Sequence, residues 1–327
     1  MTVMNVRRRL IPAAAVAAVA ALGAGTLSGC SGGTGVVANT SKFDVVASFY
    51  PMTFLAERIG GEHVRVTTLT SPGQEPHDLE ISPRQIAQLE ESDAALYLSG
   101  LQPSVDEAVA QSPVRTKIDA ARLTTLEEHG TEVGGHAAGH ATHEDGEHED
   151  GEGTGKDPHI WLDPVRYAQV AEGVGKAFEK ADPEHAADYR KNTAALAGEL
   201  DALDLRFRRS LAHTRSKVFL TTHAAFGYLA ERYGLTEEAV NGLDPESEPS
   251  AARVKALERT ARADGVSTVF YETLVSDRTA RTLAHDTGLR TDVLDPLEGI
   301  TDRSRGKDYL AVQEANLKAL RQALDAK

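Results

Sequence analysis

The chain has very little cysteine: Cys30 is the only one among 327 residues. No disulfide can therefore form within one chain, and the folded domain has no thiolate for a metal site or for nucleophilic catalysis. Any metal site in this domain must use nitrogen and oxygen ligands. Histidines and carboxylates are plentiful, with 12 His and 49 Asp and Glu.

Basic residues are also scarce relative to acidic ones, with 35 Lys and Arg against 49 Asp and Glu and a formal net charge of −14. A chain this acidic repels the phosphates of nucleic acids and attracts cations. We therefore expect no nucleic-acid partner. The length is sufficient for two domains of ordinary size with a sizeable core.

The N-terminus reads Arg7-Arg8-Arg9, then an alanine-rich apolar run, then Leu27-Ser28-Gly29-Cys30. This pattern predicts a signal peptide over residues 1–29. The final box resembles the lipobox of bacterial lipoproteins, which implies a lipid on Cys30. A transmembrane anchor is the alternative, which the alanine and glycine content disfavours. Removal of the signal leaves 32 Lys and Arg against 49 Asp and Glu, a net charge of −17.

The glycine- and serine-rich residues 30–42 are typical of a flexible tether. We therefore predict an extracytoplasmic domain that is anchored to the cell membrane by the lipid on Cys30.

From Phe43 onward, short apolar or β-branched runs alternate with amphipathic stretches. Such alternation predicts α/β architecture with parallel sheets. The longest helical pattern covers residues 183–213. We predict two α/β lobes, residues 43–182 and 214–327, joined by this one long rigid helix. The expected strands are 44–49, 64–70, 95–98, 218–221, 268–271 and 291–294, and the other expected helices are 52–59, 82–91, 163–180, 224–232, 250–263, 277–287 and 307–326.

Residues 126–156 interrupt this alternation with histidines, acids and glycines and almost no large apolar side chains. Such a composition cannot offset its ordering entropy, so we predict a solvated, disordered loop. We hypothesise that its histidines collect metal cations at low affinity; an acidic spacer that binds metal only incidentally is the alternative. The five histidines are His129, His136, His140, His143 and His148.

Four further side chains suggest a metal site. His159 lies in a stiff, proline-bounded segment, and His77 lies in the loop after strand 64–70. His223 and Asp295 each follow a predicted strand of the second lobe. Because ligands bind outside the carboxyl ends of parallel strands, we expect His77, His223 and Asp295 to point to one crevice. His77 and His159 would come from the first lobe and the other two from the second, so the ion would lie between the lobes. Three imidazoles and a carboxylate are a four-coordinate ligand set suited to zinc.

Each residue also has an ordinary structural interpretation. His77 could be merely exposed, and His223 could be a core histidine bonded to the backbone. Asp295 before Pro296 could be a turn former, as Asp-Pro often is. Glu272 could support the site from outside the ligand set, although we favour a solvated loop acid.

The motifs around these residues resemble those of the metal-binding lipoproteins of bacterial ABC importers, zinc branch, from about Phe43 to the C-terminus. The resemblance implies two lobes, a rigid linking helix, an ion at the lobe interface and a permease partner in the membrane. It implies no enzymatic activity, and we expect a monomer. It also implies that His77, His159, His223 and Asp295 are the ligands of Zn²⁺. The motifs are residues 76–83, 157–164, 222–230, 249–250 and 294–297.

Three alternatives remain at this stage. A manganese-binding member of the same family is one, although position 223 is histidine where the manganese branch commonly has glutamate, and imidazole suits zinc. A zinc hydrolase is another, but the chain lacks His-Glu-x-x-His. The third is a metal-dependent adhesin, for which no sequence feature encodes a host ligand.

Overall fold

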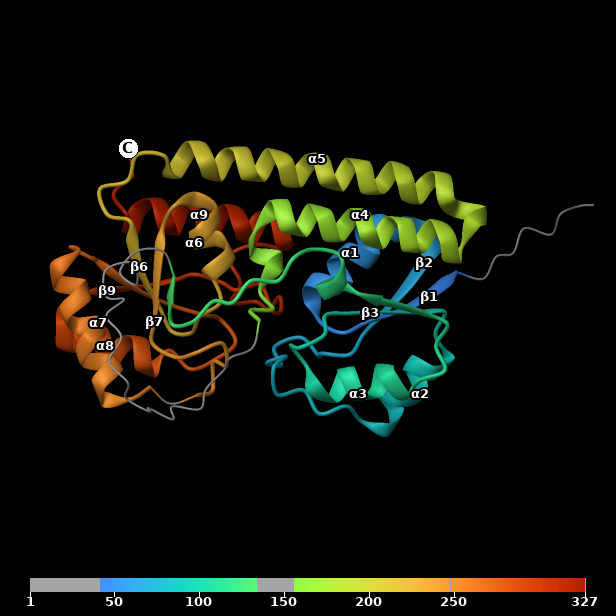
Figure 1. Cartoon of the computed structure of the whole chain (residues 1–327), viewed down its shortest axis with the longest axis horizontal. Helices are drawn as coiled ribbons and strands as arrows, with labels where there is room; N and C mark the ends of the chain where they lie inside the picture. The colour runs from blue at the N-terminus through green and yellow to red at the C-terminus, as the bar shows by residue number, and fades with distance from the viewer. Residues whose placement is uncertain (1–41, 134–155, 248, 327) are drawn as a thin grey trace, which may run out of the picture. The chain divides into compact units, whose positions relative to one another are not determined.

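Two mainly parallel sheets with helices around them form the protein in a computed structural model, which describes residues 42–133, 156–247 and 249–326 (Figure 1). The first sheet has the order β2-β1-β3-β4 and the second has the order β5-β7-β6-β8-β9. All strand pairs are parallel except β5 with β7. The predicted α/β class with two sheet-containing lobes is confirmed.

The first sheet is buried on both faces. Successive residues of its central strands are apolar and point to opposite faces of the sheet. Val45 and Ala47 of β1 face the large core under α1 and α4, whereas Val46 packs with Leu89 of α2 and Val109 of α3. The elements of this lobe are β1 (Phe43–Ala47), α1 (Tyr50–Gly60), η1 (Gly61–His63), β2 (Val64–Thr68), α2 (Pro83–Glu91), β3 (Ala94–Tyr97), α3 (Pro103–Gln111), β4 (Thr116–Asp119), η2 (Ala120–Arg122), η4 (Ile160–Leu162) and α4 (Pro164–Ala181).

The second sheet follows the same rule. Phe219 and Phe270 face the large core shared with α6 and α9, whereas Leu220 and Val269 pack against α7 and α8 in a second core. The elements are β5 (Glu132–Val133), β6 (Val218–Thr221), α6 (Gly227–Tyr233), β7 (Thr236–Ala239), α7 (Ala251–Ala263), β8 (Thr268–Tyr271), α8 (Arg278–Thr287), β9 (Arg290–Val293) and α9 (Tyr309–Ala323).

The predicted long helix is present as α5 (Ala186–Leu211), preceded by η5 (Pro183–His185). It lies beside α4, contacts α1 of the first lobe and reaches α6 and α9 of the second (Figure 1). Its buried face places Leu196, Leu203 and Phe207 at helical spacing in the same core that contains residues of both sheets. A continuous apolar core therefore connects the two lobes.

Among the strands and α-helices of the described residues, four were not predicted: β4, α3, β5 and β7. The sequence of β7 contains Glu237 and Glu238, which argues against a buried strand, yet both side chains are buried. Glu237 accepts hydrogen bonds from the Thr221 hydroxyl and the Phe226 N–H, and Glu238 pairs with Arg253. Arg253 compensates the charge of Glu238, whereas the neutral donors reach only one oxygen of Glu237, and burial raises the pKa of Glu237 to about 7.

The predicted disorder of residues 126–156 is wrong for residues 126–133, which the structure describes and which include β5. The predicted signal peptide, Cys30, His136, His140, His143 and His148 lie outside the described residues. Within the described ranges, no helix is long and apolar enough to cross a membrane.

Candidate metal centre

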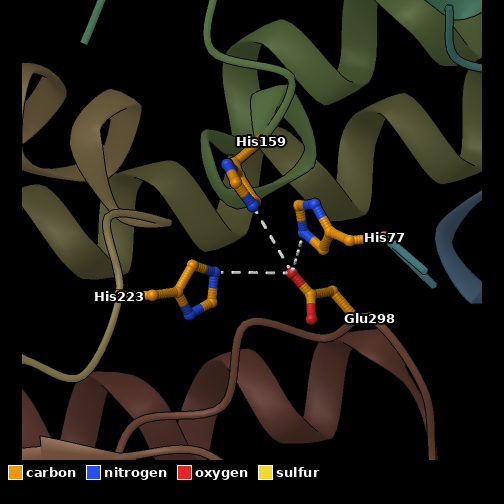
Figure 2. Close-up of side chains that lie close together, drawn as sticks. All are labelled: His77, His159, His223 and Glu298. Atoms are coloured by element: carbon orange, nitrogen blue, oxygen red, sulfur yellow. Dashed lines mark hydrogen bonds and ion pairs between the residues drawn. The ribbon is translucent and has the colours of Figure 1, made fainter. Parts of the chain in front are cut away.

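Three imidazoles and one carboxylate converge between the two lobes (Figure 2). His77 lies in the loop after β2, and His159 lies just before η4. His223 follows β6, and Glu298 follows β9. One ligand atom from each residue lies within 4.8 Å of the others. The structure thus brings together the three predicted histidines, with Glu298 as the carboxylate.

The spacing of this group suits a tetrahedral zinc site. The Nε2 atoms of His77, His159 and His223 lie 3.3, 3.4 and 3.7 Å from Oε1 of Glu298. Zn–N and Zn–O bonds of about 2.0–2.2 Å at tetrahedral angles separate neighbouring ligand atoms by roughly 3.3–3.5 Å. The three nitrogen–oxygen distances therefore approach those of a zinc site, and the ligand atoms, all within 4.8 Å of one another, would draw closer around the ion.

Two of the imidazoles are oriented by buried carboxylates. Nδ1 of His159 lies 2.7 Å from Oδ1 of Asp157, and Nδ1 of His223 lies 2.7 Å from Oε1 of Glu272. A carboxylate accepts the Nδ1–H of a neutral imidazole, which leaves the lone pair on Nε2 for a metal. Both Nε2 atoms are buried and have no hydrogen-bond partner among the described residues. Such unsatisfied buried nitrogens are what a metal site requires.

The four groups form a charged cluster before any metal binds. Burial acts to lower the pKa of His159, but the charge of Asp157 and contacts with Asp157 and Glu298 outweigh it and raise the pKa to about 9. The pKa of His223 is likewise raised, because Glu272 and Glu298 outweigh its burial. Burial acts to raise the pKa of Glu298, but contacts with the imidazoles hold it well below its usual range. Protons on the imidazoles therefore balance the buried carboxylates and compete with a metal for the same nitrogens.

The turn that carries Glu298 explains why Asp295 is not in this group. Oδ1 of Asp295 accepts a hydrogen bond from the Leu297 N–H at 2.8 Å, and its Oδ2 accepts one from the Thr273 hydroxyl at 3.2 Å. Leu297 has φ of 62°, which is uncommon for a non-glycine residue. This tight turn directs the next side chain, Glu298, towards the histidines. The structure therefore brings Glu298, three residues after the predicted Asp295, to the three histidines, and Asp295 accepts hydrogen bonds within the turn.

Glu272 also differs from the prediction. It is buried and contacts His223, so the interpretation as a solvated loop acid is wrong. It follows β8, the strand next to β6, which ends just before His223. Because β6 and β8 are parallel neighbours, their carboxyl ends lie side by side, and this could have indicated the contact. Asp157 was missed as a partner of His159, although it lies only two residues away in the same motif.

Of the five loop histidines, only His129 lies among the described residues. Its side chain is 8% exposed, and its Nδ1 lies 2.7 Å from Oδ2 of Asp157. Its ring packs edge-on against Tyr228, with the ring centroids 4.5 Å apart. His129 is thus a packed residue beside the metal centre rather than part of a solvated loop.

Two sheet-containing α/β lobes, a long connecting helix and a histidine-rich cluster between the lobes are together the arrangement expected of a metal-type solute-binding protein. The chain belongs to the family described as zinc-uptake complex component A, periplasmic (ZnuA), whose profile matches residues 45–323.

Individual relatives agree with this assignment. The zinc-binding lipoprotein AdcA of Streptococcus pneumoniae is 33% identical over 290 residues, which cover 87% of this chain and 56% of that protein. The high-affinity zinc uptake system protein ZnuA of Bacillus subtilis is 32% identical over 289 residues, covering 86% of this chain and 88% of the relative. The Zn(II)-bound ZnuA-like domain of S. pneumoniae AdcA superposes with a TM-score of 0.71 at 31% identity, covering 87% of this chain and all of that domain. The chain thus spans about half the length of its streptococcal AdcA relatives.

Proposed function

We propose that this protein captures Zn²⁺ outside the cytoplasm and delivers it to the membrane permease of an ABC importer. The observation that carries the proposal is the convergence of three histidine Nε2 atoms on one carboxylate oxygen at distances of 3.3–3.7 Å. The family assignment and the zinc-bound relative support it. Zinc is favoured over manganese because imidazole is the majority ligand type here.

In this proposal the ligands are His77, His159, His223 and Glu298, with Glu298 in place of the predicted Asp295. Four protein ligands would complete a tetrahedral set and leave no position for a catalytic water, which argues against a zinc hydrolase. The side chain of His77 is 12% exposed, whereas those of the other three are at most 1% exposed. We propose that the ion enters and leaves past His77.

The cellular arrangement is part of the same proposal. A signal peptide over residues 1–29 and a lipid on Cys30 would hold the domain at the outer face of the membrane, within reach of the permease. We retain residues 43–182 and 214–327 as the two lobes, with 183–213 as the linking helix, except that β5 of the first range pairs into the second sheet. We also retain a collecting role for the remaining loop histidines, which are His136, His140, His143 and His148.

Metal analysis tests the proposal directly. Protein purified without added metal, then loaded and passed through a desalting column, is expected to retain one tightly bound zinc per chain. Excess manganese should not displace this zinc. The His223→Ala variant should lose the tight site, because it removes one of two fully buried imidazoles. Wild-type protein that retains no zinc, or that prefers manganese, would contradict the proposed function.

Zinc affinity is expected to fall as the pH falls. The pKa of His159 in the metal-free protein is about 9, so below that pH a proton occupies a nitrogen that zinc requires. Each proton displaced on binding should weaken binding about 10-fold per unit decrease in pH. Glu298, whose pKa is held low, stays ionised throughout this range. Titration calorimetry between pH 7.5 and pH 5 measures the slope, and an unchanged affinity would disprove the proton competition.

A further inference from the structure

The carboxylate that orients His159 is shared with a second histidine. Oδ1 of Asp157 accepts from the backbone N–H of His159 at 2.9 Å and lies 2.7 Å from its ring Nδ1. The other oxygen, Oδ2, lies 2.7 Å from Nδ1 of His129. The side chain of Asp157 is fully buried. His129 therefore supplies the partner of the one carboxylate oxygen that His159 does not use.

The surroundings of His129 fix its ring in place. A Cβ added to Gly227 would lie 2.5 Å from Nδ1 of His129, so the ring occupies the space of a side chain at that position. The Tyr228 ring packs edge-on against His129, and its hydroxyl donates to the Asp157 carbonyl at 2.7 Å. Nε2 of His129 lies 3.7 Å from Oε2 of Glu231. Three of these neighbours belong to α6 of the second lobe.

The backbone after His129 is also attached to the second lobe. β5 pairs with β7, and the Thr131 carbonyl accepts hydrogen bonds from the Ala239 N–H and from Arg253, at 2.8 and 2.7 Å. The segment from His129 to Val133 therefore contacts Asp157 through His129 and then continues as β5, the edge strand of the second sheet. Its position is set by elements of both lobes.

We infer that His129 is a positioning residue of the metal centre, which acts through Asp157 to hold His159 in the tautomer and orientation that present Nε2 to zinc. Without the N–H of His129, Oδ2 of Asp157 would be buried without a donor, and the carboxylate could turn away from His159. Loss of outer partners of this kind typically weakens metal binding about 10- to 100-fold. The inference rests on the proposed zinc site.

A positioning residue and a metal collector would use the imidazole of His129 differently. The first donates an N–H from Nδ1 to Asp157, whereas the second binds metal through a ring nitrogen. A collector would bind metal through an imidazole nitrogen, so any replacement of the imidazole would remove the function. A positioning residue needs only an N–H donor at the place of Nδ1. The side-chain amide of asparagine can supply such a donor, whereas leucine has a similar branched shape at that point and no donor.

The test compares His129→Asn and His129→Leu in the full-length protein. Zinc affinity of the tight site is measured by competition with a chromophoric chelator at less than one equivalent of zinc, so that weak sites stay empty. The visible absorption of the Co²⁺-loaded protein reports the ligand geometry. The melting temperature of the metal-free protein reports packing alone.

We expect His129→Leu to weaken zinc binding about 10- to 100-fold and to shift the Co²⁺ bands, with His129→Asn within about threefold of wild type. Equal affinities in all three proteins would overturn the inference, as would equal weakening in both variants. A lower melting temperature in His129→Leu with unchanged affinity and spectrum would make His129 a packing residue and also overturn it. Failure of the wild type to bind zinc would refute the proposed function itself, which separates the two outcomes.

Discussion

Glu298→Gln is expected to lower the zinc affinity by about 100-fold or more. Removing a hydrogen-bond partner of a ligand typically costs about 10- to 100-fold, and removing the charge of a ligand should cost at least as much. Glu298 is the point on which the three imidazoles converge, and it is fully buried. Glutamine keeps the size and one oxygen but removes the charge that would neutralise the bound cation. Chelator competition measures the change, with circular dichroism to verify that the variant folds.

Asp295→Asn is the matched control for that substitution. The asparagine carbonyl oxygen can still accept from the Leu297 N–H, so the turn before Glu298 should persist. We expect its zinc affinity to change less than about 10-fold, below the loss expected for a direct ligand. A larger loss in Asp295→Asn than in Glu298→Gln would restore Asp295 as the ligand and contradict our choice of Glu298.

The three histidines could be predicted because each has a signal along the chain. His223 directly follows an apolar strand, and His77 and His159 lie in proline-bounded loops next to predicted elements. The rule that ligands lie at the carboxyl ends of parallel strands then places His77 and His223 at one crevice, and the resemblance of its motif adds His159. That rule needs only the order of strands and helices, which hydrophobic periodicity supplies.

The carboxylate could not be predicted in the same way. Asp295 and Glu298 are separated by a tight turn in which Leu297 has a positive φ of 62°. Leucine seldom adopts this conformation, so no propensity indicates it. The turn is stabilised by contacts with Thr273 and Asn316, which lie 22 and 21 residues from Asp295 in the sequence. Contacts between residues so far apart in the sequence cannot be predicted from the local sequence pattern.

Buried charge accounts for the other differences. Glu272, Glu237 and Asp157 look like surface acids by composition, yet all three are buried. Glu272 has His223 as a partner and Asp157 has two histidines, whereas Glu237 accepts from Thr221 and its burial raises its pKa to about 7. Local pattern assigns acids to solvent because an unpaired buried charge is costly, and it fails where the fold supplies a partner.

Trp161→Ala is expected to have the largest effect on stability, lowering the free energy of unfolding by about 3–5 kcal/mol. Trp161 is fully buried and packs edge-on against Phe49, with the ring centroids 4.9 Å apart. Its Nε1–H donates to the Pro296 carbonyl at 2.7 Å, and its own carbonyl accepts from the Tyr309 hydroxyl at 2.6 Å. Urea denaturation followed by circular dichroism measures the loss, since Trp161 is the only tryptophan and its fluorescence disappears with it.

Trp161→Phe separates the packing of this side chain from its hydrogen bond. Phenylalanine keeps most of the buried ring but leaves the Pro296 carbonyl without its donor, which should cost about 1–3 kcal/mol. Trp161 lies two residues after His159, and Pro296 lies two residues before Glu298, so this hydrogen bond joins the two loops that carry these ligands across the lobe interface. We therefore expect Trp161→Phe to weaken zinc binding as well as to destabilise the fold. A variant that loses stability but binds zinc as tightly as wild type would show that the ligands are held without this connection.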